Sequence, residues 1–524
     1  MSASREKKTR QDLTQQEGYV DAKAERLAKE RREQKKSNAL YICIAVVFVI
    51  AAIILAIGKS GVLQKNATAL TVDGEKFTPA QVDYFYYSAY SDIRSSEYAN
   101  YIGLDTSKAL DKQPVNDMAK SLLGITAEGD LTWDAYLKDT AASSLAEAYR
   151  LYQSAVSNGY TVDETVQAEI QTNMDSLADY ASQSGYSSKE YLKMVYGSHM
   201  DEATFRDILG MLLVAANYQN DYLEGLTYTD AELEAAYQAD TAHTYDFADL
   251  EYIYFAGTPA TTDAEGNTIE PSDAVTEAAA QAAKDAAEDA AARYAAGESL
   301  EDIAADYADI ASYVHAPEAS NAGTNVTDWA FDAARVAGDT AVLENSSNQY
   351  FVLFHGCSRP EYYRANVRHI LFHAHTDELD PTAADYDASV ESVWNETRTE
   401  AQNALDQWKS GAATADSFAD LANELSEDTG SNTTGGLYSD IYKGSNYVDS
   451  FKNWCFEDGR KVGDTGIVES TYGCHVMYLD SFADTLFWQE MVDQKLRSED
   501  YETWYQSIIA DVSVEQGSGM KYVG

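Results

Sequence analysis

The strongest constraint on the fold of this chain is an internal repeat. The segment WAFDAARVAGDTAVLE begins at Trp329, and the segment WCFEDGRKVGDTGIVE begins at Trp454. Both follow the pattern W-x-F-[DE]-x-x-R-x-x-G-D-T-x-[VI]-[LV]-E without a gap. Self-similarity at a long, fixed spacing indicates that one structural unit occurs twice in a chain. The repeat therefore predicts two copies of one domain.

The sequence before each block also repeats, with its predicted elements in the same order. Each copy has a strand-like run, a long helical run and then a short helix, SLEDIA in the first copy and SFADLA in the second. We expect Ser299 and Ser417 to be the N-caps of these short helices. The strand-like runs are 249–255 and 366–372, and the long helical runs are 274–297 and 390–411.

Strands that alternate with helices are typical of a small α/β domain, here of roughly 110 residues. The text upstream of the repeat is helical, with apolar residues three and four positions apart. It opens with a strand, an Asp-Gly turn and a helix that Thr78-Pro79 begins. The predicted class is α+β. The expected divisions are a helical domain at 69–242, the first copy at 243–358, the second copy at 362–482, and a C-terminal helix at 483–524 that packs on the helical domain.

Charge is unevenly distributed along the chain. The formal net charge is −48, yet residues 1–38 hold 11 Lys and Arg against 7 Asp and Glu. An acidic body repels phosphate groups, which excludes nucleic acid as an expected partner. The first 38 residues are read as a solvated basic tail.

One segment predicts a membrane anchor. Residues 39–58, ALYICIAVVFVIAAIILAIG, contain no charge and are long enough to span a hydrocarbon core. The basic residues before them predict a cytoplasmic N-terminus and an extracytoplasmic body. A cleaved signal peptide would have a shorter apolar core and a small-x-small site after it. A lipoprotein would carry its cysteine after the apolar run, whereas Cys43 lies near the start. We therefore expect a single-pass, uncleaved signal anchor.

Four cysteines are few for an exported chain of 524 residues, which argues against a disulfide scaffold. Cys43 lies in the apolar segment. Cys455 and Cys474 could form a disulfide, but the simpler interpretation is that they are small buried thiols.

The second copy contains the residues that suggest chemistry. His369 in VRHILF and His475 in YGCHVMYL lie within apolar strand patterns, and Asp428 ends LSED just before the loop TGSNTTGGLYSD. Aromatic residues follow in GSNYVDSFKNWCF. A single histidine among apolar neighbours is usually a core residue, so the ordered set indicates a site more strongly than any one member.

This ordered set resembles the parvulin-type peptidyl-prolyl isomerase domain over about 366–482. Parvulins carry a histidine in the first strand, an Asp or Cys after the short helix, a G-G-x-L-G loop, apolar residues after a basic-Gly pair, and a G-x-H-I-I final strand. The matching text here is VRHILF, FADLANELSEDTGSNTTGGLYSD, KGSNYVDSF and VGDTGIVESTYGCHVMYL. One departure is Tyr438, which stands where the loop usually has Gly.

The resemblance implies catalysis of rotation about X–Pro bonds, whose uncatalysed isomerisation takes tens of seconds or more across a barrier of about 18–20 kcal/mol. No bond is made or broken, so the site must hold the proline ring and stabilise a twisted amide. It implies no cofactor and no metal. The implied catalytic residues are His369, Asp428, His475 and Ser470, and the implied substrate-binding residues are Leu371, Tyr447, Phe451 and Phe456.

The wider arrangement resembles membrane-anchored, extracytoplasmic foldases of the PrsA and SurA type. TVDGEKFTPAQVDYFYY is similar to their opening strand and helix, and SSKEYLKMVYGSHMDEATFRDIL to their peptide-binding helical module. This resemblance implies that 69–242 binds peptides and that the partners are unfolded exported polypeptides. With the anchor, it favours the cell membrane of a Gram-positive bacterium.

The first copy lacks the polar residues of the second. Alignment of the strand places Tyr252 against His369, and alignment of the block places Tyr350 against His475. Ile310 corresponds to Asp428, and no Gly-Gly pair follows the short helix. The resemblance therefore implies a catalytically inactive parvulin-like domain that is retained for binding or spacing.

Two further hypotheses concern the start of the second copy. His369, His373 and His375 have strand spacing that places them on one face, with Asp377 beyond, which is a possible metal-ligand set. The parvulin pattern already accounts for His369, so we favour the isomerase. The segment HAHTDELDPTAADYD is acidic, which argues against a preference for phosphorylated substrates.

Two other function classes compete with a foldase. A tethered holdase would use both copies only to bind chains, without catalysis. A structural surface protein would fit the size, the acidity and the 38 tyrosines, but it predicts long β-repeats that the sequence lacks.

Overall fold

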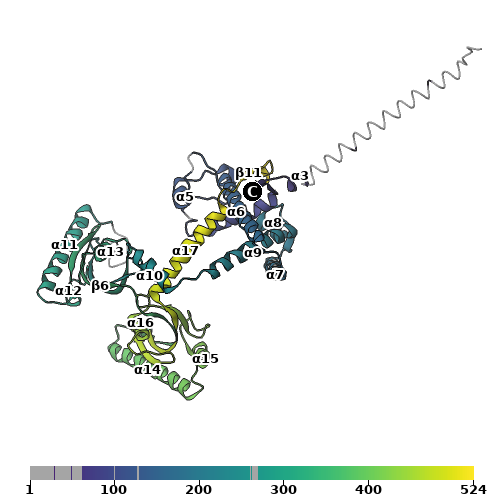
Figure 1. Cartoon of the computed structure of the whole chain (residues 1–524). Coiled ribbons are helices and arrows are strands. Elements are labelled where there is room, and N and C mark those ends of the chain that lie inside the picture. Colours follow the sequence, from purple (N-terminus) through teal and green to yellow (C-terminus); the bar gives the residue numbers. More distant parts are fainter. Residues whose placement is uncertain are drawn as a thin grey trace, which may run out of the picture. The chain divides into compact units, whose positions relative to one another are not determined.

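The computed structural model describes residues 62–99, 101–126, 129–259, 261 and 270–524, together with the single positions 29 and 49. The predicted tail at 1–38 and anchor at 39–58 lie outside these ranges, apart from those two positions. Within the described ranges, no helix is both long and apolar enough to cross a membrane. The chain forms two compact units, one that runs up to Gly225 and also contains Tyr501–Gly524, and one that runs from Leu226 to Asp500. Figure 1 labels their elements.

The first unit contains a small antiparallel sheet with the order β11-β1-β2. Strands β1 (Leu70–Val72) and β2 (Glu75–Phe77) form a hairpin. Its Asp-Gly turn has positive φ at both central residues, 49° at Asp73 and 88° at Gly74, the combination that favours tight hairpins. The third strand, β11 (Val514–Gln516), comes from the far end of the chain and pairs with β1.

Helices make up the rest of the first unit. The helix start predicted at Thr78-Pro79 is confirmed, because the backbone amide of Thr78 donates to the side-chain oxygen of Gln81 (2.9 Å) in a capping box. Trp133, Leu137 and Tyr86 are buried in its core, which also includes Met520 and Val523. The helices are α3 (Val62–Lys65), α4 (Pro79–Ser95), η1 (Leu110–Lys112), α5 (Asp117–Leu122), α6 (Trp133–Ser157), α7 (Glu164–Gln183), α8 (Ser188–Tyr196), α9 (Glu202–Gly225) and η3 (Met520–Tyr522).

The second unit contains two four-stranded antiparallel sheets with equivalent strand orders, β4-β3-β6-β5 and β8-β7-β10-β9. The strands predicted at 249–255 and 366–372 are confirmed. The strands of the first sheet are β3 (Phe247–Phe255), β4 (Ala311–Ser320), β5 (Thr340–Asn345) and β6 (Asn348–Ser358), and those of the second are β7 (Tyr363–His373), β8 (Leu437–Ile441), β9 (Thr465–Ser470) and β10 (Gly473–Leu486).

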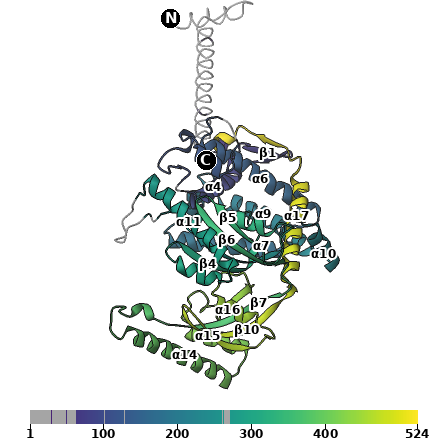
Figure 2. The same cartoon turned by 90° about the vertical axis from the view of Figure 1, so that its left-hand side faces the viewer.

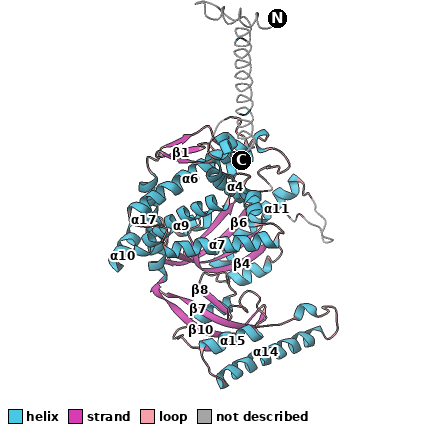
Figure 3. Cartoon of the chain, turned by 90° about the vertical axis from the view of Figure 1, so that its right-hand side faces the viewer, coloured by secondary structure: helices cyan, strands magenta, loops and turns pink. Residues whose placement is uncertain are grey.

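Each sheet carries helices at equivalent places in the chain. The predicted long helices are confirmed as α11 and α14, and Figures 2 and 3 show α14 beside α15 and the strands of the second sheet. Ser299 caps α12 as expected, but the expectation for Ser417 is wrong, because Thr414 is the N-cap of α15. The helices are α10 (Asp230–Ala239), α11 (Asp273–Ala295), α12 (Leu300–Asp306), α13 (Asn325–Ala330), η2 (Thr376–Glu378), α14 (Tyr386–Ser410), α15 (Ala415–Leu425), α16 (Asp449–Cys455) and α17 (Phe487–Ile509).

The two faces of the second sheet pack against different helices. Ile370 and Val476 lie in a core with α14 and α15, whereas Val367 and Met477 lie in a core with α16. Successive side chains of a strand point to opposite faces, so the odd-numbered residues of β7 and β10 face α16. This alternation places His369 and His475 on the α16 side.

The same alternation decides the open question about the cysteines. Cys474 packs in the core with α14 and α15, and Cys455 packs in the core with α16. Both are buried and free, and they lie on opposite faces of the sheet. The alternative of a disulfide between them is therefore not realised.

Candidate active site

Strand register brings His369 and His475 together. In the antiparallel pair β7 and β10, His369 lies opposite Met477 and His475 lies opposite Leu371. The two histidines are therefore diagonal neighbours on one face, within reach of each other. Their Nδ1 atoms are 3.1 Å apart, and the side chains are buried.

Asp428 reaches the histidines from the loop that follows α15. Its Oδ2 lies 2.8 Å from Nε2 of His369. The same carboxylate accepts hydrogen bonds from the hydroxyls of Ser431 (2.5 Å) and Tyr438 (2.9 Å) and from the amide of Gly430 (3.1 Å). The hydrogen bond from His369, supported by these other donors, holds the pKa of Asp428 well below its ordinary value. Asp428 is therefore an anion at neutral pH.

The Gly-Gly pair allows the next part of this loop to approach strand β7. The amide of His369 donates to the carbonyl oxygen of Gly436 (2.9 Å). Gly436 has a φ of +67°, and a Cβ there would lie 2.2 Å from the carbonyl oxygen of His369. Gly435 has a φ of +70°, and a Cβ there would lie 2.6 Å from Cβ of Ala419. Only glycine meets both the conformation and the space at these positions.

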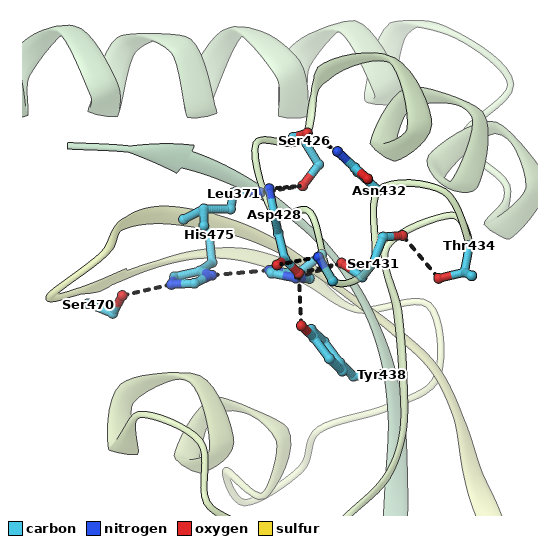
Figure 4. Close-up of polar contacts among 11 residues, drawn as sticks. Leu371, Ser426, Asp428, Ser431, Asn432, Thr434, Tyr438, Ser470 and His475 are labelled. Carbon is cyan, nitrogen blue, oxygen red and sulfur yellow. Dashed lines mark hydrogen bonds and ion pairs between the residues drawn. The ribbon is translucent and has the colours of Figure 1, made fainter. Parts of the chain in front are cut away.

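Ser470 extends the polar chain, which is the series of hydrogen-bonded side chains Asp428, His369 and His475, beyond His475. Its hydroxyl lies 2.7 Å from Nε2 of His475. Figure 4 marks this hydrogen bond with a dashed line. With both rings neutral, Ser470 donates to His475, His475 donates through Nδ1 to His369, and His369 donates through Nε2 to Asp428. Burial is the main cause that lowers the pKa of His475, to about 4, and the neighbouring His369 lowers it further. His475 is therefore neutral near pH 7, which this direction of donation requires.

A cavity of about 480 Å³ opens above these polar groups. His369, His475 and Asp428 line it on the polar side. Of the four residues expected to contact substrate, three line the cavity and one does not. Leu371, Tyr447 and Phe451 are lining residues, but Phe456 packs edge-on against Tyr362, with ring centroids 5.2 Å apart.

Aromatic rings form the apolar side of the cavity. The ring of Phe451 stands edge-on to His369 (5.2 Å, 88°) and to His475 (5.4 Å, 74°). Tyr447 lies beside Phe451 at 5.6 Å and beside Tyr438 at 5.2 Å. The result is a cup of the size and polarity that accepts a small apolar ring, with an anion and a neutral histidine at its edge.

The sequence did not single out four of the lining residues, Tyr438, Asn446, Val448 and Tyr472. Tyr438 is the most informative, because its hydroxyl contacts Asp428. Burial and the carboxylate of Asp428 raise the pKa of Tyr438 to about 12, which keeps its hydroxyl a donor. Its position two residues after the Gly-Gly pair was the available signal. The parvulin motif, however, identified Tyr438 only as a departure from the Gly that is usual at this position.

The alternative metal-ligand set is not brought together. The rings of His373 and His375 stack at 5.1 Å, and Nε2 of His375 lies 3.7 Å from Glu427. Across the described ranges, the one group of His, Cys, Asp or Glu whose ligand atoms gather as a metal site requires is His243, Asp246 and Cys357. It does not include His369.

The first copy has phenol rings at the positions of the two histidines. Tyr252 lies opposite Val352, and Tyr350 lies opposite Tyr254, the same diagonal register as that of His369 and His475. The centroids of Tyr252 and Tyr350 are 5.9 Å apart. Ile310, aligned with Asp428, packs against the apolar core.

The titration of His475 predicts a pH dependence. The unfolded chain binds a proton at this ring near pH 6.5, whereas the folded protein does so only near pH 4. The contribution of His475 to stability is therefore complete above about pH 6.5 and is lost as the pH falls towards 4. We expect the free energy of unfolding to be independent of this group above about pH 6.5 and to decrease as the pH falls from 6.5 to 4. NMR titration of the His475 ring checks the assignment, and a midpoint near 6.5 would contradict it.

Residues 356–481 match the family described as the PPIC-type PPIASE domain. No curated protein matches the chain.

Several solved structures share low overall similarity with the chain. PrsA from Bacillus subtilis is 12% identical with a TM-score of 0.26, over 73% of this chain and 89% of that one. The peptidylprolyl isomerase PrsA from Bacillus anthracis is 17% identical with a TM-score of 0.18, over 29% and 58%. A SurA-like chaperone from Campylobacter jejuni is 20% identical with a TM-score of 0.17, over 28% and 51%. The chain spans about half the length of the PrsA structures from Bacillus anthracis and Streptococcus pneumoniae and of the SurA-like chaperone from Campylobacter jejuni.

Proposed function

Given that residues 356–481 form a parvulin-type peptidyl-prolyl cis-trans isomerase domain, we propose that the chain is a membrane-anchored foldase that isomerises X–Pro bonds at the cavity described above. The observation that carries this proposal is the continuous polar chain from Ser470 through His475 and His369 to Asp428, which lies at the edge of an aromatic cup. Such a chain fixes the orientation of a carboxylate without exposing it fully to water.

The proposed mechanism is electrostatic and steric. Resonance in the planar amide places partial negative charge on the carbonyl oxygen and double-bond character in the C–N bond. A substrate carbonyl near the anionic Asp428 would lose part of that resonance, which lowers the barrier to rotation. Phe451, Tyr447 and Leu371 would hold the proline ring while the preceding residue turns. His369, His475 and Ser470 would keep the carboxylate in place.

The other parts of the chain receive roles in the same proposal. The segment 39–58 would anchor the protein in the cell membrane, with residues 1–38 in the cytoplasm and the body outside. The helical region 69–242 would bind unfolded exported polypeptides. Large exposed apolar side chains on and beside α7 and α8 support this role, namely those of Tyr180, Tyr186 and Met194. The first copy, 243–358, would be an inactive parvulin-like domain beside the active copy at 362–482.

The test is a proline-isomerisation assay of the full-length protein in detergent, with peptides that vary in the residue before proline. We expect catalysis proportional to protein concentration. His475→Phe should lower it at least tenfold, because the ring can no longer donate to His369. Tyr350→Phe is the matched control, since it removes the polar atom at the equivalent position of the first copy, and it should leave the rate unchanged.

The result that would overturn the proposal is a wild-type protein without catalysis on any peptide. If such a protein still suppressed aggregation of an unfolded client, the competing hypothesis of a tethered holdase would replace it.

A further inference from the structure

The first copy contacts a loop of the second copy that forms part of the cavity. We call residues 442–448 the cup loop, because Asn446, Tyr447 and Val448 line the cavity. At the other end of this loop lies Glu318, from strand β4 of the first copy. The hydroxyl of Tyr362 donates to Glu318 (2.7 Å) and accepts from the amide of Lys443 (3.2 Å).

The backbone of the cup loop also lies directly against Glu318. The amide of Gly444 is close enough to the carboxylate of Glu318 to act against the rise of its pKa. The approach is close, because a Cβ on Gly444 would lie 3.2 Å from both Cβ and the carbonyl oxygen of Glu318. The space that glycine leaves here is therefore filled by the ring of Tyr442 and by the Cβ and carbonyl oxygen of Glu318.

Glu318 is a half-buried carboxylate with several partners. Desolvation raises its pKa, while the hydrogen bond from Tyr362, the backbone amide of Gly444 and the positive charges of Lys443 and Lys452 act in the opposite direction. A half-buried acceptor that loses its donor is costly, so Glu318 and its partners favour a single arrangement of the loop. Glu318 lies on β4, an edge strand of the first copy, where unpaired acceptors would otherwise be exposed to water.

An aromatic contact fixes the first residue of the cup loop. The ring of Tyr442 forms a three-ring cluster with Phe247 of the first copy (6.4 Å, 20°) and Phe487 at the start of α17 (4.9 Å, 41°). The first copy therefore contacts the loop by two independent side chains, one polar and one apolar.

Internal hydrogen bonds couple these contacts to the cavity. The amide of Tyr442 donates to the hydroxyl of Ser445 (2.8 Å), and the amide of Tyr447 donates to the carbonyl oxygen of Ser445 (2.8 Å). Ser445 is buried. The loop is thus a tight, bonded turn, so a displacement at Gly444 is passed on to Tyr447.

We propose that the first copy positions the active site of the second: Glu318, together with Tyr362, holds the cup loop so that Tyr447 and Val448 close the substrate cavity. Glu318 is a positioning residue, since it contacts neither the cavity nor the residues around Asp428. This role explains why the first copy keeps its fold although Tyr252 and Tyr350 have replaced the two histidines. The inference rests on the proposed isomerase function.

The test compares two substitutions of Glu318 in the full-length protein. Glu318→Ala removes the acceptor, and we expect KM for a prolyl peptide to rise about tenfold while kcat changes less than about twofold, because the loop supplies binding and not chemistry. Glu318→Gln keeps an acceptor oxygen for the hydroxyl of Tyr362 and should restore most of the affinity. The control is Glu344→Ala on the exposed strand β5 of the first copy, which should change neither constant.

Hydrogen exchange separates positioning from loss of fold. In Glu318→Ala we expect faster exchange of the amides at Gly444 and Tyr447, and unchanged exchange in β3 and β6 of the first copy. Unchanged KM and unchanged loop exchange in a folded Glu318→Ala variant would overturn the proposal. If the wild-type protein proved inactive on every peptide, the isomerase function would fail, and the exchange of the cup loop would still decide whether Glu318 holds it.

Discussion

Replacement of Asp428 by asparagine is expected to lower kcat/KM for prolyl peptides about 10²-fold, a size typical for the loss of one preorganised electrostatic group. Asparagine preserves the volume and can still accept from Tyr438 and Ser431 through its amide oxygen. It removes the negative charge that would disfavour resonance in the substrate amide. The rates are measured by the proline-isomerisation assay at pH 7, where Asp428 is an anion in the native protein.

The matched control for this change is Asp420→Asn. Asp420 is exposed on α15, the helix that precedes Asp428, so the substitution changes the net charge equally without touching the cavity. We expect its rate to equal that of the native protein. Equal rates for Asp428→Asn and Asp420→Asn would show that the carboxylate at 428 does not contribute to catalysis, and the polar chain would then be a structural network.

Replacement of Gly436 by alanine is expected to destabilise the second copy by at least about 2 kcal/mol. The left-handed backbone at φ +67° accounts for about 1–3 kcal/mol, and a Cβ 2.2 Å from the carbonyl oxygen of His369 forces β7 or the loop to move. A movement of β7 or of the loop would shift the hydrogen-bond partners of His369. Native-state hydrogen exchange of the β7 amides measures this loss, and the isomerisation rate should fall with it.

Gly459→Ala separates the two causes. Gly459 has a φ of +86° and no atom within 4 Å of the position of a Cβ, so alanine there adds backbone strain without a clash. We expect a smaller loss of stability than at Gly436 and unchanged exchange in β7. A loss in β7 that is the same for both variants would mean that the close approach of Gly436 to His369 has no energetic importance.

Local sequence patterns were sufficient to predict many of the strands, helices and turns of this protein. The repeated W-x-F block and the matching text before it predicted two copies of one unit, and the structure has two sheets of equivalent order. The apolar patterns of VRHILF and YGCHVMYL predicted the strands that contain His369 and His475, and the Gly-Gly pair predicted a loop after the short helix. These inferences succeeded because strand periodicity, turn residues and glycine conformations depend on a few neighbouring residues.

Other predictions depended on partners far away in the chain. Phe456 follows the apolar motif closely in sequence, yet the end of α16 directs its ring to Tyr362 instead of the cavity. Thr414, and not Ser417, caps α15. Both residues are of a type that suits an N-cap, and the path of the preceding loop decides between them.

The sequence by itself determined the two-copy α+β organisation, the strands that carry the histidines and the loss of the polar residues from the first copy. Only the tertiary structure decided that the two Nδ1 atoms meet at 3.1 Å, that Tyr438 contacts Asp428, that Cys455 and Cys474 lie on opposite faces of the sheet, and that Glu318 of the first copy contacts the cup loop. The physical reason is that a sequence pattern fixes which face a side chain takes, whereas the atom it meets depends on register and packing between segments far apart in the chain.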